Sequence, residues 1–207
     1  MQINIDKKSG IFIGIIAALL IITMALAMPG RLGDGMKGKE RNGSAKMDHH
    51  SSLGSADLSG ADIMFLQMMI PHHQQAIDIS DLALTKSADA ELLALAKDIR
   101  DEQAAEIVKM KAWLKDAGAD LEMGHSMDHS MGGMLSDSEL AALKAATGKS
   151  FDLLWLKGMT GHHDGAIDMA AMIENAKNPE IKSFGQAIVS SQSEQNKQMA
   201  AMLKRMG

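Results

Sequence analysis

The sequence predicts an all-α protein, a four-helix bundle built from two repeated helical hairpins and preceded by an N-terminal hydrophobic helix. The main observation is an internal repeat: residues 62–80 recur as residues 152–170, with eight identical positions. Such repetition indicates that one structural unit is used twice. Apolar residues recur at helical spacing in both copies, and the low content of aromatic residues (3%) and the three prolines favour helices over strands.

The N-terminus carries a segment that predicts export. Residues 11–28 form an uncharged apolar run that follows two lysines. Residues 1–28 are therefore either an uncleaved signal anchor in the inner membrane or a signal peptide that is cleaved at an Ala-Leu-Ala motif. Both alternatives place the rest of the chain in the periplasm or otherwise outside the cytoplasm, anchored or secreted, because the lysines stay inside. The chain has no cysteine, which excludes a lipoprotein anchor and disulfide bonds.

Residues 29–56 are rich in Gly, Ser, Lys and Asp and have no hydrophobic periodicity, so they are predicted to be a flexible linker. This linker contains a short group of candidate metal ligands, Met47, His49 and His50. Residues 57–207 are predicted to form the four-helix bundle, with an insert at residues 117–135.

The first hairpin is predicted to begin at Ser59, because Ser59 and Asp62 have the spacing of a capping box. Its first helix has an apolar face that includes His73, and Pro71 is expected to interrupt and kink this helix. The same position of the second copy is Gly161, which also weakens a helix. The second helix of the hairpin is expected over residues 89–116, where buried-type residues recur every three or four positions.

The second hairpin is predicted to follow the same plan. Ser136 and Glu139 form another capping-box pattern, which opens a short helix that ends near Ala146. The repeat then resumes near Phe151, and Pro179 is expected in the first turn of the last helix.

The insert carries the densest group of candidate metal ligands. Its glycines and serines oppose a helix, so its methionines have no core to fill. Thioether and imidazole groups together suit the soft ions Cu(I) and Ag(I). The alternative is a flexible surface loop in a methionine-rich protein. The candidate ligands of the insert are Met123, His125, Met127, His129, Met131 and Met134.

The two histidine pairs form a second candidate site, made of His72 and His73 with Met69 and, in the other copy, His162 and His163 with Met159. The helical spacing places His73 towards the interior, and His72 about 100° round the helix on its flank. Each methionine lies three or four residues before its histidines, which makes them neighbours on the helix surface.

Polar residues also occupy expected core positions of the partner helices: Gln103, Glu106, Gln192 and Gln195. Inward side chains from facing helices build metal sites in four-helix bundles. A fully hydrogen-bonded polar layer that binds nothing is the alternative. The repeated Asp78 and Asp168 are either acceptors that orient the histidines or solvated surface residues.

These motifs resemble the family catalogued as domain of unknown function 305, which includes CopM-like copper-binding proteins. The resemblance rests on the segment from Phe65 through the first histidine pair to Ile77, on the pattern from Ile99 to Leu114, and on the second copy from Phe151 to Met169. It covers roughly residues 57–206 of the chain. The resemblance implies a ferritin-like four-helix fold, export in bacteria, and copper binding and resistance in some members.

The sequence thus predicts an exported copper-binding protein for metal sequestration, delivery or resistance, with Cu(I) as the favoured ion and metal-transport proteins as candidate partners. One alternative is a membrane-tethered structural or interaction bundle with incidental metal binding. A ferritin-like metal oxidase is less favoured, since no Glu-x-x-His pair falls in a predicted helix, and the chain is expected not to be an enzyme. The net charge of −5 without a dense basic patch argues against nucleic-acid binding, and the oligomeric state stays open.

Overall fold

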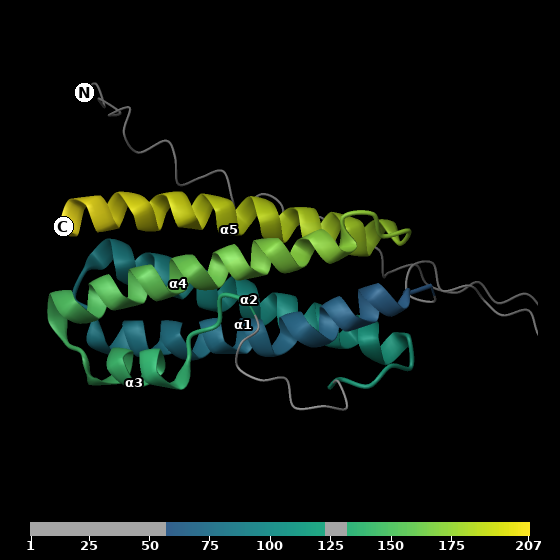
Figure 1. The fold of residues 1–207 in the computed structure, drawn as a ribbon, viewed down its shortest axis with the longest axis horizontal. Coiled ribbons are helices and arrows are strands. Elements are labelled where there is room, and N and C mark those ends of the chain that lie inside the picture. Colours follow the sequence, from purple (N-terminus) through teal and green to yellow (C-terminus); the bar gives the residue numbers. More distant parts are fainter. Residues whose placement is uncertain (1–56, 123–131) are drawn as a thin grey trace, which may run out of the picture. The chain divides into compact units, whose positions relative to one another are not determined.

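The protein is described by a computed structural model that covers residues 57–122 and 132–207, and every regular element in these ranges is a helix (Figure 1). The all-α class is therefore confirmed. The predicted hydrophobic helix and the linker lie outside the described residues. Within the described ranges, no helix combines the length and the apolar character that a membrane span requires. The helices are α1 (Gly60–Lys86), α2 (Ala90–Asp116), α3 (Asp137–Ala145), α4 (Gly148–Ala170), the short 3-10 helix η2 (Ala171–Ile173) and α5 (Pro179–Met206).

The helix ends follow from local hydrogen bonds. The Ser59 hydroxyl accepts from the backbone N–H of Asp62 at 3.2 Å, while the Asp62 carboxylate accepts from the backbone N–H of Ser59 at 2.8 Å. Ser136 and Glu139 form the same reciprocal pair at the start of α3. Pro179 is the first residue of α5, where its missing N–H is not needed. The three predicted helix starts are confirmed.

The interruption expected at Pro71 does not occur. Helix α1 is continuous from Gly60 to Lys86, and α4 is likewise continuous through Gly161. Pro71 lies on the exposed side of α1, so the backbone hydrogen bond that its missing N–H removes is lost on the solvent-facing side and not in the core. Packing of fully buried neighbours such as Met69 and His72 holds the helix together on the other side.

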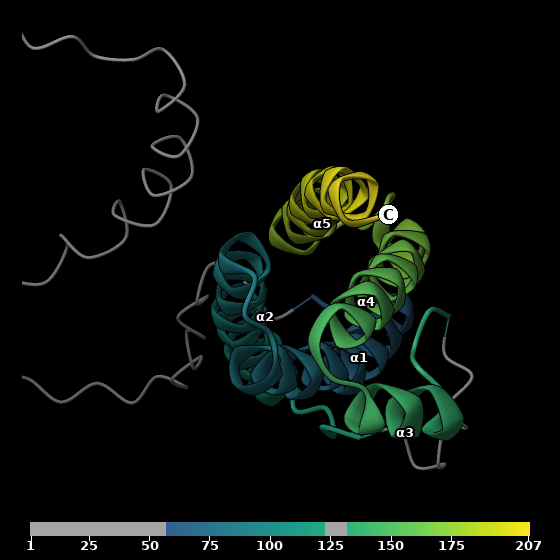
Figure 2. The same ribbon diagram turned by 90° about the vertical axis from the view of Figure 1, so that its left-hand side faces the viewer.

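Two helical hairpins make up the frame. Helix α1 packs along α2, and α4 packs along α5, while α1 and α4 also contact each other directly. Viewed along the helices, α1 lies between α2 and α4, and α3 lies outside against α4 (Figure 2). Helices α2 and α5 approach each other at few points. Helix α1 is therefore covered on two sides.

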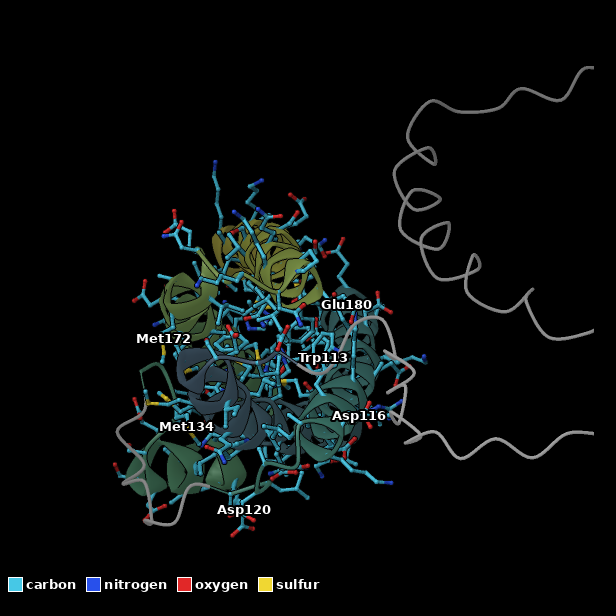
Figure 3. The ribbon with its side chains drawn as sticks, turned by 90° about the vertical axis from the view of Figure 1, so that its right-hand side faces the viewer. Trp113, Asp116, Asp120, Met134, Met172 and Glu180 are labelled. Carbon is cyan, nitrogen blue, oxygen red and sulfur yellow. The ribbon has the colours of Figure 1, made fainter. Side chains whose placement is uncertain are left out.

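The apolar core is divided into two clusters at opposite ends of the long helices. One cluster contains Trp155, which is fully buried and donates its indole N–H to the Ile79 carbonyl at 3.0 Å. The other contains Phe65, Trp113 and Phe184, with their rings edge to face. At this end Trp113 donates to the Glu180 carboxylate at 3.2 Å and ties α2 to α5 (Figure 3).

Candidate metal centre

A polar layer separates the two apolar clusters. On each long helix, the layer residues follow the members of one cluster and precede those of the other. The layer therefore lies across the middle of the hairpin pair, and its residues come from all four long helices. We define the polar layer as His72 and His73 of α1, Gln103 and Glu106 of α2, His162 and His163 of α4, and Gln192 and Gln195 of α5.

The four histidines are completely buried, with 0% of their surface exposed. The rings of His72 and His162 lie close together and tilted, with 3.8 Å between their centroids and 38° between their planes. The two copies of the repeat thus meet at their histidine pairs. The sequence prediction placed His73 inside, which is confirmed. It placed His72 on the flank that carries Met69 and Ala76, and this flank is buried too, because α1 is covered by α4 as well as by α2.

Each imidazole uses its Nε2 atom for one hydrogen bond to an oxygen. His72 Nε2 lies 3.2 Å from the Gly132 carbonyl, and His162 Nε2 lies 2.9 Å from the His72 carbonyl. A backbone carbonyl can only accept, so these two rings must carry their proton on Nε2.

The other two rings bond to side chains of the partner helices. His73 Nε2 lies 2.7 Å from a Glu106 carboxylate oxygen, and His163 Nε2 lies 2.6 Å from the Gln195 amide oxygen. The Gln195 amide is oriented by its NH2 group, which donates to the Glu102 carboxylate at 2.7 Å. His73 and His163 therefore also donate from Nε2. A carboxylate or carbonyl that accepts from one ring nitrogen fixes which nitrogen is left to bind a metal.

The four Nδ1 atoms are consequently lone-pair donors in the buried interior. Among the described residues, none of these buried nitrogens has a hydrogen-bond partner. An unsatisfied buried polar atom costs about 1–3 kcal/mol, so four of them in one layer require an explanation. The neutral imidazole nitrogen is a common ligand of transition metals. The chemistry of these donors, taken one by one, suits a transition-metal ion.

The surroundings keep three of the rings, those of His72, His162 and His163, in the neutral form that can bind a metal. Burial, aided by the nearby His73, lowers the pKa of His72 to about 3. Burial also lowers the pKa of His163 to about 4 and holds the pKa of His162 well below its usual range. Protons therefore do not compete for these nitrogens near neutral pH. Burial and the neighbouring Glu106 raise the pKa of Glu102 at the edge of the layer.

The methionines supply sulfur next to this layer. Met69 and Met159 are completely buried, each one helical turn before a histidine pair. Within residues 57–122 and 132–207, no three His, Asp or Glu side chains form a ready-made metal-binding group. In this arrangement, the imidazoles and carboxylates by themselves do not complete a coordination sphere.

Two side-chain amides of the polar layer also have buried atoms without a hydrogen-bond partner among the described residues. Gln103 and Gln192 are each 2% exposed. Considering the described residues alone, both side-chain polar atoms of Gln103 and the amide oxygen of Gln192 make no hydrogen bond. The partner-helix positions that the sequence predicted as polar and inward are thus confirmed. Asp78 and Asp168 are exposed, and Asp78 accepts from Gln74, which favours the surface alternative for this pair.

A contact that the sequence analysis missed brings the end of the insert to the layer. Gln75 exchanges two hydrogen bonds with the backbone of Leu135, at 2.7 and 3.0 Å. Gly132 and Gly133 lie against Gly165 of α4, so closely that a Cβ on Gly165 would overlap the Gly132 carbonyl. The sequence does hold a signal, because Gly165 stands where the first copy has Gln75.

The remaining predicted ligands divide by location. Met134 is partly buried on the side of the hairpins that carries α3 (Figure 3). The others lie outside the described residues, and their metal binding stays a prediction: Met47, His49, His50, Met123, His125, Met127, His129 and Met131.

The fold and the layer define a class of helical proteins with two related hairpins that meet at paired, buried histidines. The family model described as a domain of unknown function (DUF305) matches residues 62–203. The chain therefore belongs to the DUF305 family.

Solved structures of DUF305 proteins and of CopM are similar to this chain in sequence and in fold. A DUF305 protein from Streptomyces coelicolor is 30% identical with a TM-score of 0.67, and the match covers 71% of this chain and 94% of that one. A DUF305 fragment from Deinococcus radiodurans is 29% identical with a TM-score of 0.66, over 71% and 97% of the two chains. CopM in its Cu(II)-bound form is 34% identical with a TM-score of 0.62, over 70% and 97%. CopM is also known in Cu(I)-bound, silver-bound and apo forms. None of the curated proteins matches the chain.

Proposed function

We propose that this protein is an exported copper-binding protein that holds Cu(I), and by the same softness Ag(I), for sequestration, delivery or resistance. The observation that carries the proposal is the set of four buried Nδ1 lone pairs, which have no partner among the described residues. A soft monovalent ion accepts imidazole and thioether ligands together, and Met69 and Met159 lie one turn from the rings.

Two further observations support the proposal. CopM, to which this chain is 32–34% identical, binds Cu(II), Cu(I) and silver. The methionines and histidines of the insert and the linker add ligands of the same kind, and Gly132 and Leu135 hold the end of the insert beside the layer. Ligands of this kind suit a buffer or a carrier that hands copper to a transport partner rather than an enzyme.

The apolar run at residues 11–28 supports a location outside the cytoplasm, tethered to the inner membrane if the run is not cleaved. The Streptomyces coelicolor relative is itself described as a candidate secreted protein. The hairpin pair would then be the ferritin-like four-helix frame that positions the ligands. Protein partners would be metal-transport proteins on the same side of the membrane.

A double substitution tests the proposal without removing the hydrogen bonds of the layer. His73→Gln with His163→Gln keeps a donor NH2 near the position of Nε2 and deletes Nδ1. We expect anaerobic Cu(I) titration of the full chain to show fewer bound ions per chain and at least about a tenfold loss of affinity in the bundle, equivalent to about 1.4 kcal/mol. The remaining ions would belong to His72 and His162 and to the Met/His segments, which are the Met- and His-containing parts of the linker and the insert.

Met172→Leu serves as the matched control, because Met172 is a partly exposed methionine outside the layer. It should leave both the affinity and the stoichiometry unchanged. Circular dichroism of each variant reports whether the helices persist. Unchanged Cu(I) binding in the folded double variant would contradict a role for the histidine pairs.

A further inference from the structure

The two halves of the polar layer differ chemically at one matched position. Glu106 of the first half corresponds to Gln195 of the second half in the repeat. Both side chains accept from a buried histidine at nearly the same distance, 2.7 Å from His73 and 2.6 Å from His163. The geometry is thus conserved between the halves while the charge is not.

This difference acts on Nδ1, the ring nitrogen that would be free to bind a metal. Negative charge beside Nε2–H makes the imidazole a more basic ligand at Nδ1 and offsets the charge of the ion that Nδ1 binds. His73 has this charge in direct contact. His163 has a neutral amide in contact, and the Glu102 carboxylate is one hydrogen bond further away, on the far side of Gln195.

We infer that Glu106 and Gln195 are positioning residues that make the two halves unequal metal sites, with His73 favouring divalent Cu(II) and His163 favouring monovalent Cu(I). The reason is electrostatic, because a divalent ion gains more than a monovalent ion from the same neighbouring carboxylate. The inference rests on the proposed function, since it assumes that both Nδ1 atoms bind copper.

Two variants exchange the charge while keeping the hydrogen bonds. Glu106→Gln leaves an amide oxygen to accept from His73 and removes the charge. Glu102→Gln together with Gln195→Glu puts a carboxylate in direct contact with His163. The new amide at position 102 can then donate a hydrogen bond to the new carboxylate at position 195. This pair keeps the net charge of the chain and avoids two adjacent carboxylates.

The test is a site-resolved NMR titration of the full-length chain, in which the ring signals of His73 and His163 are followed separately. In the wild type, substoichiometric Cu(II) should broaden the His73 ring signals before those of His163. Glu106→Gln should weaken Cu(II) binding at His73 by about 10–100-fold, which is typical for loss of a carboxylate behind a histidine ligand. The Glu102→Gln, Gln195→Glu variant should strengthen Cu(II) binding at His163.

A titration with Ag(I), a diamagnetic monovalent ion, gives the comparison. We expect the same variants to change Ag(I) binding less than Cu(II) binding. Each tenfold selective loss of Cu(II) at His73 would raise the copper reduction potential there by about 59 mV.

The outcomes separate the two claims. The inference is overturned if the His73 and His163 signals broaden at the same Cu(II) concentration in the wild type. It is also overturned if neither variant changes which ring responds first. Copper binding itself would stand in both cases. If neither ring responds to Cu(I), Cu(II) or Ag(I), the proposed function itself fails.

Discussion

Acidification from pH 7 to pH 5 is expected to destabilise the metal-free protein by several kcal/mol. His72, His162 and His163 are held neutral in the fold, with the pKa of His72 lowered to about 3 and that of His163 to about 4. In the unfolded chain the same rings titrate near pH 6.5. The unfolded state therefore binds more protons throughout this window, and the free energy of unfolding falls as the pH falls.

Each ring contributes on the order of 1 kcal/mol per pH unit between its unfolded and folded pKa values. The contribution of these rings is fully present above pH 6.5 and is lost progressively towards pH 4. Glu102 acts in the opposite direction, because its raised pKa lets the folded state take up a proton first. One carboxylate at the edge of the layer does not offset three buried rings.

Urea unfolding of the apoprotein at a series of pH values measures this effect. The matched variant is His163→Gln, which removes one titrating ring and keeps its hydrogen bond to Gln195. Its unfolding free energy should depend less steeply on pH than that of the wild type. A midpoint that does not move between pH 7 and pH 5 would show that the rings are not held neutral by the fold.

Gly165→Ala is expected to destabilise the protein by about 1–3 kcal/mol, the usual cost of overpacking a rigid interior. The added Cβ would overlap the Gly132 carbonyl and lie 2.8 Å from the Gly133 nitrogen, and both are backbone atoms that cannot rotate away. The segment from Gly132 to Leu135 would have to leave α4. His72 would then lose the carbonyl that accepts from its Nε2.

Gly161→Ala, one helical turn earlier, is the control with the opposite sign. In the described part of the structure, a Cβ at Gly161 meets nothing within 4 Å. Alanine inside a helix is more stable than glycine by about 0.5–1 kcal/mol, so this variant should gain stability. Thermal unfolding of both variants measures the two stability changes, since about 1 kcal/mol shifts Tm by about 2–4 °C in a domain of this size. Tm should fall for Gly165→Ala and rise for Gly161→Ala. Equal shifts in the two variants would contradict the close contact at Gly165.

The sequence was sufficient for those features that depend on local pattern. The capping boxes at Ser59 and Ser136 specify helix starts through bonds over three residues, so they are readable without a structure. The repeat predicted two related hairpins. The polar residues at core positions of α2 and α5, such as Gln103 and Gln195, predicted the layer because helical spacing placed them on the buried face.

Other features required knowledge of which helices are neighbours. Helical spacing assumes one buried face, whereas α1 is covered by α2 and by α4, so spacing alone did not show that the flank with His72 is buried. The proton on each Nε2 depends on acceptors as distant in sequence as Gly132, which lies 60 residues from His72. Pro71 weakens a helix locally, but its exposed position made the cost small enough for packing to override it.

The central claim is that the Nδ1 atoms of the buried histidine pairs bind a coinage metal ion. Anomalous diffraction at the copper edge, from crystals of the Cu(I)-loaded protein, tests it most directly because it locates each ion. The account predicts an anomalous peak in the polar layer, within bonding distance of Nδ1 atoms and of a methionine sulfur from Met69 or Met159. Anomalous peaks confined to the Met/His segments, with no peak in the layer, would contradict it.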